Sequence, residues 1–442
     1  MTLTNKVEHK AVIFRHLLIY FYAFILLEGI LRKWVVPGLA TPLFFVKYIF
    51  SFACLIFFFT NKRQIKTKQY PFIGIVVFLL FYCFLELFNL DYSGTVLVGI
   101  IGLIVHFGFL SVAIVIPLVV YRKEHIKNTL FILTIICLGI FILGIIQYFS
   151  SPYGFINKYV SDDPSSIALV GKYPRIVTIF SYIGTYTSFL NFVLILLLLQ
   201  VISITQINLK SIIIVATFLL GIVNIFMTGS RGPVGLFFIM ATIIFFMYAV
   251  SLQGKKVLSY VFNFFILSAL MYFVATQTEA GSASVGSFMD RVENSDNVGS
   301  RIEDAFNPFK YLDQAGLIGF GLGTTYQGAQ SLMKPSGPLP SYEEESERLV
   351  LEVGLVGFIL IVVMRMSIFL YSFKTYRMMK DPFLKLIALS LLIHQIPTVL
   401  IFNMQVFNWL ENVVYWTEIG ILVSINIIAQ HEKNQYTGIT PL

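Results

Sequence analysis

The sequence predicts an all-α polytopic membrane protein. Of its 442 residues, 57% are hydrophobic and only 12% are charged, whereas a soluble globular chain has about 25% charged residues. The mean hydropathy is +0.83, and the apolar residues fall into runs of about 20, the length that crosses a bilayer as a helix. These observations exclude a water-soluble protein.

Twelve apolar runs predict about 12 transmembrane helices. They lie near residues 12–31, 41–60, 71–89, 95–120, 128–149, 176–199, 209–227, 233–251, 257–275, 349–372, 383–401 and 412–429. The last run is the weakest, because Glu411 and Glu418 interrupt it.

Two connections are long, near residues 150–175 and 276–348. The second divides the chain into helices 1–9 (1–275), an external loop (276–348), and helices 10–12 with a tail (349–442). The loops on the same side as the termini hold 18 basic and four acidic residues, and the alternate loops hold 11 basic residues over far more sequence. Because cytoplasmic loops carry the excess of Lys and Arg, we expect both termini in the cytoplasm and both long loops outside.

The net charge of +8 does not indicate nucleic-acid binding, because no basic domain carries it. The three cysteines lie within apolar runs, so no disulfide is expected. The sequence contains no HExxH, no CxxC and no P-loop, which predicts chemistry without a metal, ATP or another cofactor.

The stretch "MTGSRGPVG" (227–235) joins two apolar runs on the external side. Arg231 there runs against the tendency of basic residues to stay inside. Its glycines, Gly232 among them, tolerate unusual backbone angles, and Ser230 can cap a helix with proline in its first turn. A helix N-terminus beside a guanidinium suits a phosphate. The alternative is an arginine that extends to lipid headgroups.

Two further basic pairs lie next to the bilayer on the same side. Lys172 and Arg175 precede one span, and Arg32 and Lys33 follow the first span. Because the positive-inside rule disfavours such charges, we expect an anionic, membrane-embedded ligand that is handled from outside.

The long external loop predicts short helices at the membrane surface. A capping box over residues 300–303 predicts one helix start. Asn307 and Pro308 fit a second start, and Gly316 fits its end. Arg301 falls at the first start, where it is either a ligand-binding residue or a solvated surface arginine.

The stretch "GLIGFGLGTTYQG" (316–328) supplies Gly321 and Gly323, which allow the backbone either to turn close to a substrate or simply to reverse direction. Four acidic residues come just before the next span, namely Glu343, Glu344, Glu345 and Glu347. One of them, with Glu343 and Glu347 as the candidates, is expected to act as a general base on a hydroxyl substrate. The alternative is a solvated cluster that matches the helix dipole.

Together these stretches resemble the O-antigen polymerase and O-antigen ligase superfamily of bacterial envelope glycan enzymes. The resemblance is strongest from about residue 172 to residue 360. It is carried by "PRIVTIFSYIGTY" (174–186), "TGSRGPVG" (228–235), Arg301 followed by "GLIGFGLG" (316–323), "RLVLEVGLVGFIL" (348–360) and, for some members, "LEGILRKWVVP" (27–37).

The resemblance implies a GT-C-like glycosyltransferase of the bacterial inner membrane. Donor and acceptor would be undecaprenyl-diphosphate-linked glycans, used on the external face, and a chain-length regulator is a further partner that it allows. Carried onto this chain, Arg231 and Arg301 bind the diphosphate, with Arg175 as an additional partner. Ligase members carry a histidine near the end of the long loop; this chain has none in 276–348, which favours a polymerase.

The implied reaction is an inverting, metal-independent displacement, in which an acceptor hydroxyl attacks the anomeric carbon and undecaprenyl diphosphate leaves. Fixed cations stabilise the charge that develops on such a leaving group. An O-antigen ligase, a lipid-linked glycan flippase or transporter, and a non-catalytic assembly subunit are the alternatives. The sequence leaves open whether the product is O-antigen, capsule or exopolysaccharide.

Overall fold

The computed structural model describes residues 3–60, 67–160, 167–170, 172–251, 307–333, 339–340, 342, 344–400 and 406–437, with isolated positions between 265 and 289. Over these residues the protein is an all-α polytopic membrane protein, with ten helices long and apolar enough to cross a bilayer. The same residues include one short antiparallel pair of strands, β1 (Leu169–Val170) and β2 (Tyr173–Pro174). The predicted fold class is confirmed at this level.

The helices follow the predicted apolar runs in order. In the first half they are α1 (Leu3–Ile30), η1 (Leu31–Val35), η2 (Pro37–Leu39), α2 (Ala40–Thr60), η3 (Thr67–Gln69), α3 (Ile73–Glu86), α4 (Val96–Phe107), α5 (Leu110–Val119), α6 (Lys123–Phe149) and η4 (Phe155–Asn157). In the second half they are α7 (Ile183–Ile202), α8 (Leu209–Met227), α9 (Arg231–Ser251), α13 (Leu312–Ala315), η6 (Gln327–Leu332), α14 (Glu345–Met378), α15 (Pro382–His394), α16 (Ile396–Leu400) and α17 (Trp409–Thr437).

Three predicted runs differ from the helices found. The run at 71–89 corresponds to α3, which has only 14 residues. The run at 176–199 begins as a helix only at Ile183, because a strand and turns occupy the residues just before it. The run at 257–275 lies outside the continuously described residues, so the predicted number of 12 spans stays a prediction.

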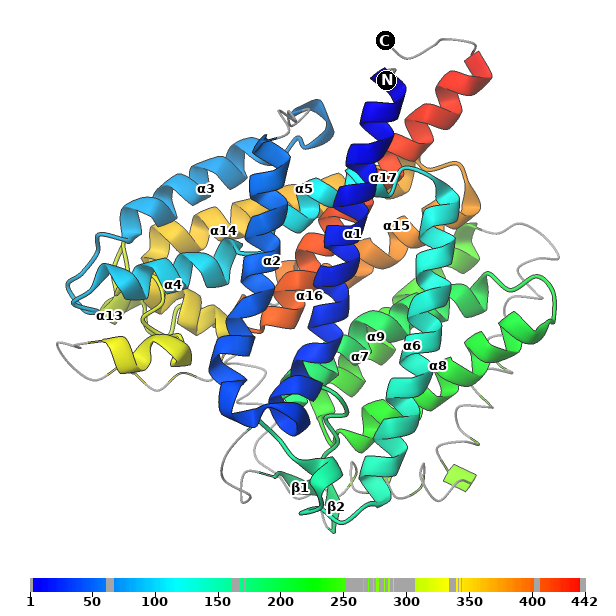
Figure 1. Cartoon of the computed structure of the whole chain (residues 1–442), viewed down its shortest axis with the longest axis horizontal. Coiled ribbons are helices and arrows are strands. Elements are labelled where there is room, and N and C mark those ends of the chain that lie inside the picture. Colours follow the sequence, from blue (N-terminus) through cyan, green and yellow to red (C-terminus); the bar gives the residue numbers. More distant parts are fainter. Residues whose placement is uncertain are drawn as a thin grey trace.

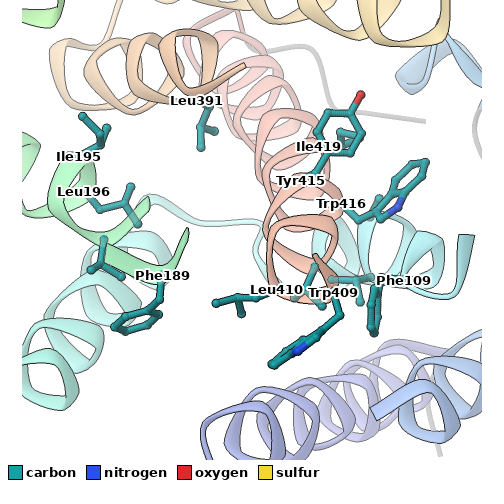
Figure 2. Close-up of a cluster of buried hydrophobic side chains, with 14 of the residues drawn as sticks. Phe109, Phe189, Ile195, Leu196, Leu391, Trp409, Leu410, Tyr415, Trp416 and Ile419 are labelled. Carbon is teal, nitrogen blue, oxygen red and sulfur yellow. The ribbon is translucent and has the colours of Figure 1, made fainter. Parts of the chain in front are cut away.

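Helix α17 is central to the packing of the molecule. Its most extensive contacts are with α5, and it also contacts α7, α14 and α15. Figure 2 shows Trp416 of α17 near Phe109, with Leu391 of α15 and Phe189 of α7 in the same apolar cluster. Trp416 is only 2% exposed and Phe109 is fully buried. The start of α1 and the end of α17 lie at the same end of the molecule (Figure 1).

Helix α14 is broken at Gly354, and the long loop forms hydrogen bonds with the backbone groups that the break leaves without helical partners. Gly354 has φ of +62° inside the helix, which suits glycine because it has no Cβ. The backbone N–H of Leu355 donates to the Gly316 carbonyl oxygen at 3.1 Å, and the N–H of Phe320 donates to the Leu351 carbonyl oxygen at 2.7 Å. A broken helix survives in a membrane only when its freed backbone groups find partners, and residues 316–321 supply them.

The loop predictions are partly correct. Gly316 ends the short helix α13 with φ of +62°, as predicted. The predicted start at Asn307 and Pro308 is wrong, because residues 308–311 form turns and α13 begins only at Leu312. The predicted capping box over 300–303 lies outside the described residues.

Candidate functional site

The turn that joins α8 to α9 carries Arg231 as the first residue of α9. Gly229 adopts φ of +62° and therefore requires glycine in the turn. Gly232 lies inside α9 with open space where a Cβ would stand, so its backbone does not require glycine. Arg175 reaches this turn from a distant part of the chain. Its Nε donates to the Thr228 carbonyl oxygen at 2.7 Å, and its Nη2 donates to Ser230 Oγ at 2.6 Å.

Residues 174–181, which we call the linking segment, connect this turn to the end of α1. Arg175 at one end of the segment holds the α8–α9 turn. At the other end, the Thr178 carbonyl oxygen accepts a hydrogen bond from Lys33 Nζ, and Ser181 Oγ accepts one from Arg32 Nη1 at 3.1 Å. One short segment therefore brings together three of the predicted basic regions.

Thr178 lies at a strained point of the linking segment. Its φ of +47° falls in the left-handed region, which a β-branched residue rarely adopts. Gln147 holds it from both sides: Gln147 Oε1 accepts from the Thr178 N–H at 2.7 Å, and Gln147 Nε2 donates to the Thr178 carbonyl oxygen at 3.2 Å. Such strain persists only where the surroundings fix the backbone, and it concentrates at functional sites.

We group four basic side chains, Arg32, Lys33, Lys47 and Arg348, as the cation cluster. Arg32 and Lys33 contact the linking segment, Lys47 shares a carboxylate with Arg32, and Arg348 acts with Arg32 on the hydroxyl of Tyr326. Arg32 and Lys47 share Glu28, with Nη1 to Oε1 at 2.8 Å and Nζ to Oε2 at 2.9 Å. Glu28 and Lys47 are fully buried, and Arg32 is 9% exposed. Lys33 is 1% exposed and bonds to the Thr178 carbonyl, with its Nζ 4.2 Å from the Trp34 ring centre.

Arg348 joins the cluster from the first turn of α14. Its guanidinium lies 3.8 Å from the centre of the Phe407 ring, and its Nη2 donates to the Thr325 carbonyl oxygen at 3.0 Å. Within the part of the chain that the structure describes, neither Arg348 nor Lys33 forms an ion pair with a carboxylate. A desolvated cation–π contact contributes about 2 kcal/mol. That is less than the several kcal/mol that it costs to bury a charge.

The hydroxyl of Tyr326 lies within electrostatic range of two members of the cation cluster, Arg32 and Arg348. Burial raises the pKa of its hydroxyl to about 12, while the positive charges of Arg32 and Arg348 act against that rise. The hydroxyl therefore interacts electrostatically with both guanidinium groups, and it stays protonated at neutral pH. Lys47 connects the cluster to α17, because its Nζ lies 4.3 Å from the centre of the Trp409 ring.

The predicted glutamates take different positions. Glu343 lies outside the described residues. Glu347 is 1% exposed; its carboxylate accepts from the Glu344 N–H at 3.4 Å and lies 3.6 Å from Lys310 Nζ. This is a capping arrangement at the start of α14. Because the Glu347 side chain is buried in it, Glu347 is not part of a solvated cluster. Glu345 is half-buried and accepts from the backbone N–H groups of residues 407 and 408, at 3.3 and 3.0 Å.

A polar group at the start of α17 was not predicted as a site. Ser188 of α7 donates to the Glu411 carboxylate, and Asn408 Nδ2 donates to Ser188 Oγ at 2.7 Å. The available signal was that Glu411 interrupts an apolar run, because ionisable residues in membrane segments face the protein interior and are usually functional.

The predicted glycines serve packing. Gly321 and Gly323 are buried, with φ of +97° and +80°. A Cβ on Gly323 would stand 2.3 Å from the Val98 carbonyl oxygen, and one on Gly321 would stand 2.7 Å from the Asn89 carbonyl oxygen. These glycines let the loop lie directly on the backbone at and before α4. Their predicted part in substrate binding stays a prediction.

Lys172 and Arg301 are the two other predicted basic residues. Lys172 is exposed, with its Nζ 5.1 Å from the Tyr173 ring centre. Arg301 lies outside the described residues. The structure therefore connects Arg32, Arg175 and the Ser230–Arg231 turn through one segment.

Comparison of the chain with models of known protein families and with curated proteins finds no match. The functional assignment therefore rests on the residues described above.

Proposed function

We propose that this protein is a membrane glycosyltransferase that polymerises undecaprenyl-diphosphate-linked oligosaccharide repeat units on the external face of the bacterial inner membrane. The cation cluster is the observation that carries this proposal. Four basic side chains lie in an apolar body, and among the described residues Glu28 alone stands within ion-pair distance of them. Unneutralised charge in a membrane is costly and usually functional. A lipid diphosphate supplies the missing negative charge and reaches the site through the bilayer.

The linking segment supports the same proposal from the protein side. It joins the cation cluster to the α8–α9 turn, where Arg231 begins a helix. Helix N-termini and guanidinium groups are both favourable partners for phosphate oxygens. The proposed diphosphate site therefore extends from Arg32 and Lys33 to Arg231.

In the proposed reaction, a hydroxyl oxygen of the acceptor glycan attacks the anomeric carbon of the donor sugar, and the configuration at that carbon inverts. The bond from that carbon to the diphosphate oxygen breaks, and undecaprenyl diphosphate leaves with the electron pair. Fixed cations lower the barrier because they meet the charge as it develops. The hydroxyl proton passes to a carboxylate, for which we propose Glu345, half-buried and one helical turn from Arg348.

The test is a polymerisation assay with protein in nanodiscs, lipid-linked repeat units as substrate, EDTA present and ATP absent. Product length is read on a gel. We expect a ladder of longer lipid-linked glycans from the wild type. Arg348→Ala should lower the rate by about 100-fold or more, the usual loss for one such contact, and Arg348→Lys should restore part of it because charge is kept but planar geometry is lost.

Arg377→Ala is the matched control, because Arg377 is an exposed arginine at the other end of the same helix. It should polymerise like the wild type. A folded Arg348→Ala protein with a wild-type ladder would refute the assignment of the cation cluster. Translocation of intact substrate across sealed vesicles, without longer products, would show a flippase instead.

A further inference from the structure

A cavity of about 480 Å³ lies where α6 and α8 begin, α7 ends and α15 begins. Its volume is within the range of about 300–1,000 Å³ that is typical of ligand sites. The connections around it belong to the basic loops that share a side with the chain termini. The cavity is thus separate from the cation cluster and the linking segment.

The polar part of the cavity is positively charged. Lys127 and Lys210 line it, and none of the residues that line it is acidic. Their Nζ atoms lie over aromatic rings, 5.4 Å from the Phe383 centre and 4.4 Å from the Phe131 centre. In the described part of the chain neither lysine forms an ion pair, since the nearby Asp381 pairs with a different lysine, Lys123.

The N-terminus of α8 adds to this positive potential. Asn208 caps the helix, with its Oδ1 accepting from the Ser211 N–H at 2.9 Å, and Asn208 and Ser211 also line the cavity. The partial positive charge of a helix N-terminus favours an anion. Two ammonium groups and a helix end therefore act on the same space.

Much of the remaining lining of the cavity is apolar, and exposed apolar side chains lie beside it. Buried side chains such as Leu130, Ile214 and Leu386 line it. On the connection beside it, Ile207 is 90% exposed and Leu209 is 73% exposed. Apolar side chains so exposed next to basic ones are typical of a surface that sits in the membrane interface.

We propose that this cavity binds the phosphate headgroup of an anionic phospholipid from the leaflet at the basic end of the protein. The phosphate would lie between Lys127 and Lys210, and the first methylene groups of the acyl chains would contact the apolar wall. This inference is independent of the proposed glycosyltransferase activity, because it concerns the opposite end of the membrane-spanning helices.

The test is native mass spectrometry of the full chain with phosphatidylglycerol or phosphatidylcholine of identical acyl chains. We expect the wild type to bind its first phosphatidylglycerol about tenfold or more tightly than phosphatidylcholine, since each basic residue near a membrane surface contributes appreciably. Lys127→Gln with Lys210→Gln should abolish that preference. Lys374→Gln with Lys380→Gln, two exposed lysines outside the cavity on the same set of loops, should retain it.

A second variant tests the cavity without changing charge. Thr205→Trp narrows it at an exposed lining position and should weaken phosphatidylglycerol binding while both lysines remain. If the two double lysine variants lost the preference for phosphatidylglycerol equally, the proposal would be overturned, because general surface charge would then explain the preference. Unaltered binding in Thr205→Trp, or inorganic phosphate binding as tightly as the lipid in a titration, would overturn it as well.

Discussion

The four basic residues of the cation cluster are held by three kinds of partner: a carboxylate, a backbone carbonyl and an aromatic ring. Arg32 and Lys47 divide the two oxygens of Glu28, Lys33 is held by a backbone carbonyl, and Arg348 lies on an aromatic ring. A single carboxylate therefore fixes the position of two cations and neutralises only one charge. The residual positive charge is what makes the cluster suited to an anion.

Replacing Arg231 tests whether the proposed site reaches the α8–α9 turn. Arg231→Ala should abolish detectable polymer, because the guanidinium at the start of α9 would no longer meet the diphosphate. Arg231→Lys should give a short ladder, since the charge remains without bidentate geometry. Product length on a gel measures both, with thermal unfolding as the check of folding. Wild-type polymer from Arg231→Ala would limit the site to the cation cluster.

Much of the site could not be predicted from the sequence because its contacts join distant residues. Arg231 and Arg175 stood out, since each lies beside a span on the side where basic residues are rare. Lys47 lies within an apolar run, and nothing local shows that it faces Glu28. Arg348 lies on the ring of Phe407, which comes just before α17. The periodicity of an apolar run gives a helix but does not choose which of its faces meets a given neighbour.

Among the helices and loops, α14 and the loop before it form one unit. Residues 316–321 bond to the broken turn of α14 around Gly354, and the glycines there allow backbone to approach backbone. Glu352, in the same turn, accepts from Thr325 Oγ1 at 2.7 Å and lies 3.1 Å from His106 Nε2. In the structure, the glycine-rich stretch therefore completes a broken helix.

A matched pair of glycine substitutions tests the close packing of this loop on α4. Gly323→Ala should destabilise the protein by about 1–3 kcal/mol, because its φ of +80° and the Val98 carbonyl oxygen 2.3 Å from the added Cβ both oppose a side chain. Gly232→Ala, in open space within α9, should be neutral or stabilising by up to about 1 kcal/mol. Thermal unfolding in one detergent compares the two, and equal destabilisation would contradict the packing role.

The start of α15 should depend on pH through Asp381. Its Oδ1 accepts from the Leu384 N–H at 2.9 Å, and its other oxygen pairs with Lys123. Burial tends to raise its pKa, but Lys123 and the helix N–H groups outweigh burial, so the pKa is lowered. The stabilisation is therefore complete above the ordinary carboxyl pKa and is lost as pH falls through the lower, folded-state pKa.

Two variants separate the contributions of Asp381. Asp381→Ala should destabilise by about 1 kcal/mol at pH 7, the usual cost of losing a cap. Asp381→Asn keeps a cap and should cost less, and it should remove the acid sensitivity that this residue contributes. Thermal unfolding at pH 7 and at pH 3 measures both. An Asp381→Asn protein as acid-sensitive as the wild type would show that other carboxylates control the transition.

For the molecule as a whole, the basic loops and the cation cluster lie at opposite ends of the long helices. The start of α1 and the end of α17 share one end (Figure 1), while η1, with Arg32 and Lys33, follows the other end of α1. This arrangement agrees with the counted excess of basic residues in alternate loops. The overall order of helices was predictable, because each apolar run of about 20 residues by itself indicates one helix that crosses the bilayer.

Labelling with a membrane-impermeant maleimide tests the orientation. The cysteines Cys54, Cys83 and Cys137 are buried and can be removed first. Tyr153→Cys, at a 68% exposed position after α6, should be labelled in intact cells. Ile207→Cys, at a 90% exposed position after α7, should be labelled only after the membrane is opened. The reverse pattern would invert the proposed topology.

The short helix α3 has a consequence for the lipid around the protein. Its 14 residues give a length of about 21 Å, against a hydrocarbon thickness of about 30 Å. Its outer side is apolar, with Val77, Phe78 and Phe81 each 57% exposed, so lipid tails must meet it directly. A helix shorter than the hydrocarbon layer is accommodated by local thinning of the bilayer, by flanking side chains that extend to the interface, or by association with another protein. Because lipid tails meet α3 directly, we expect the bilayer to be thinner along this flank of the protein. A bulky polar headgroup would then cross a shorter hydrocarbon layer there.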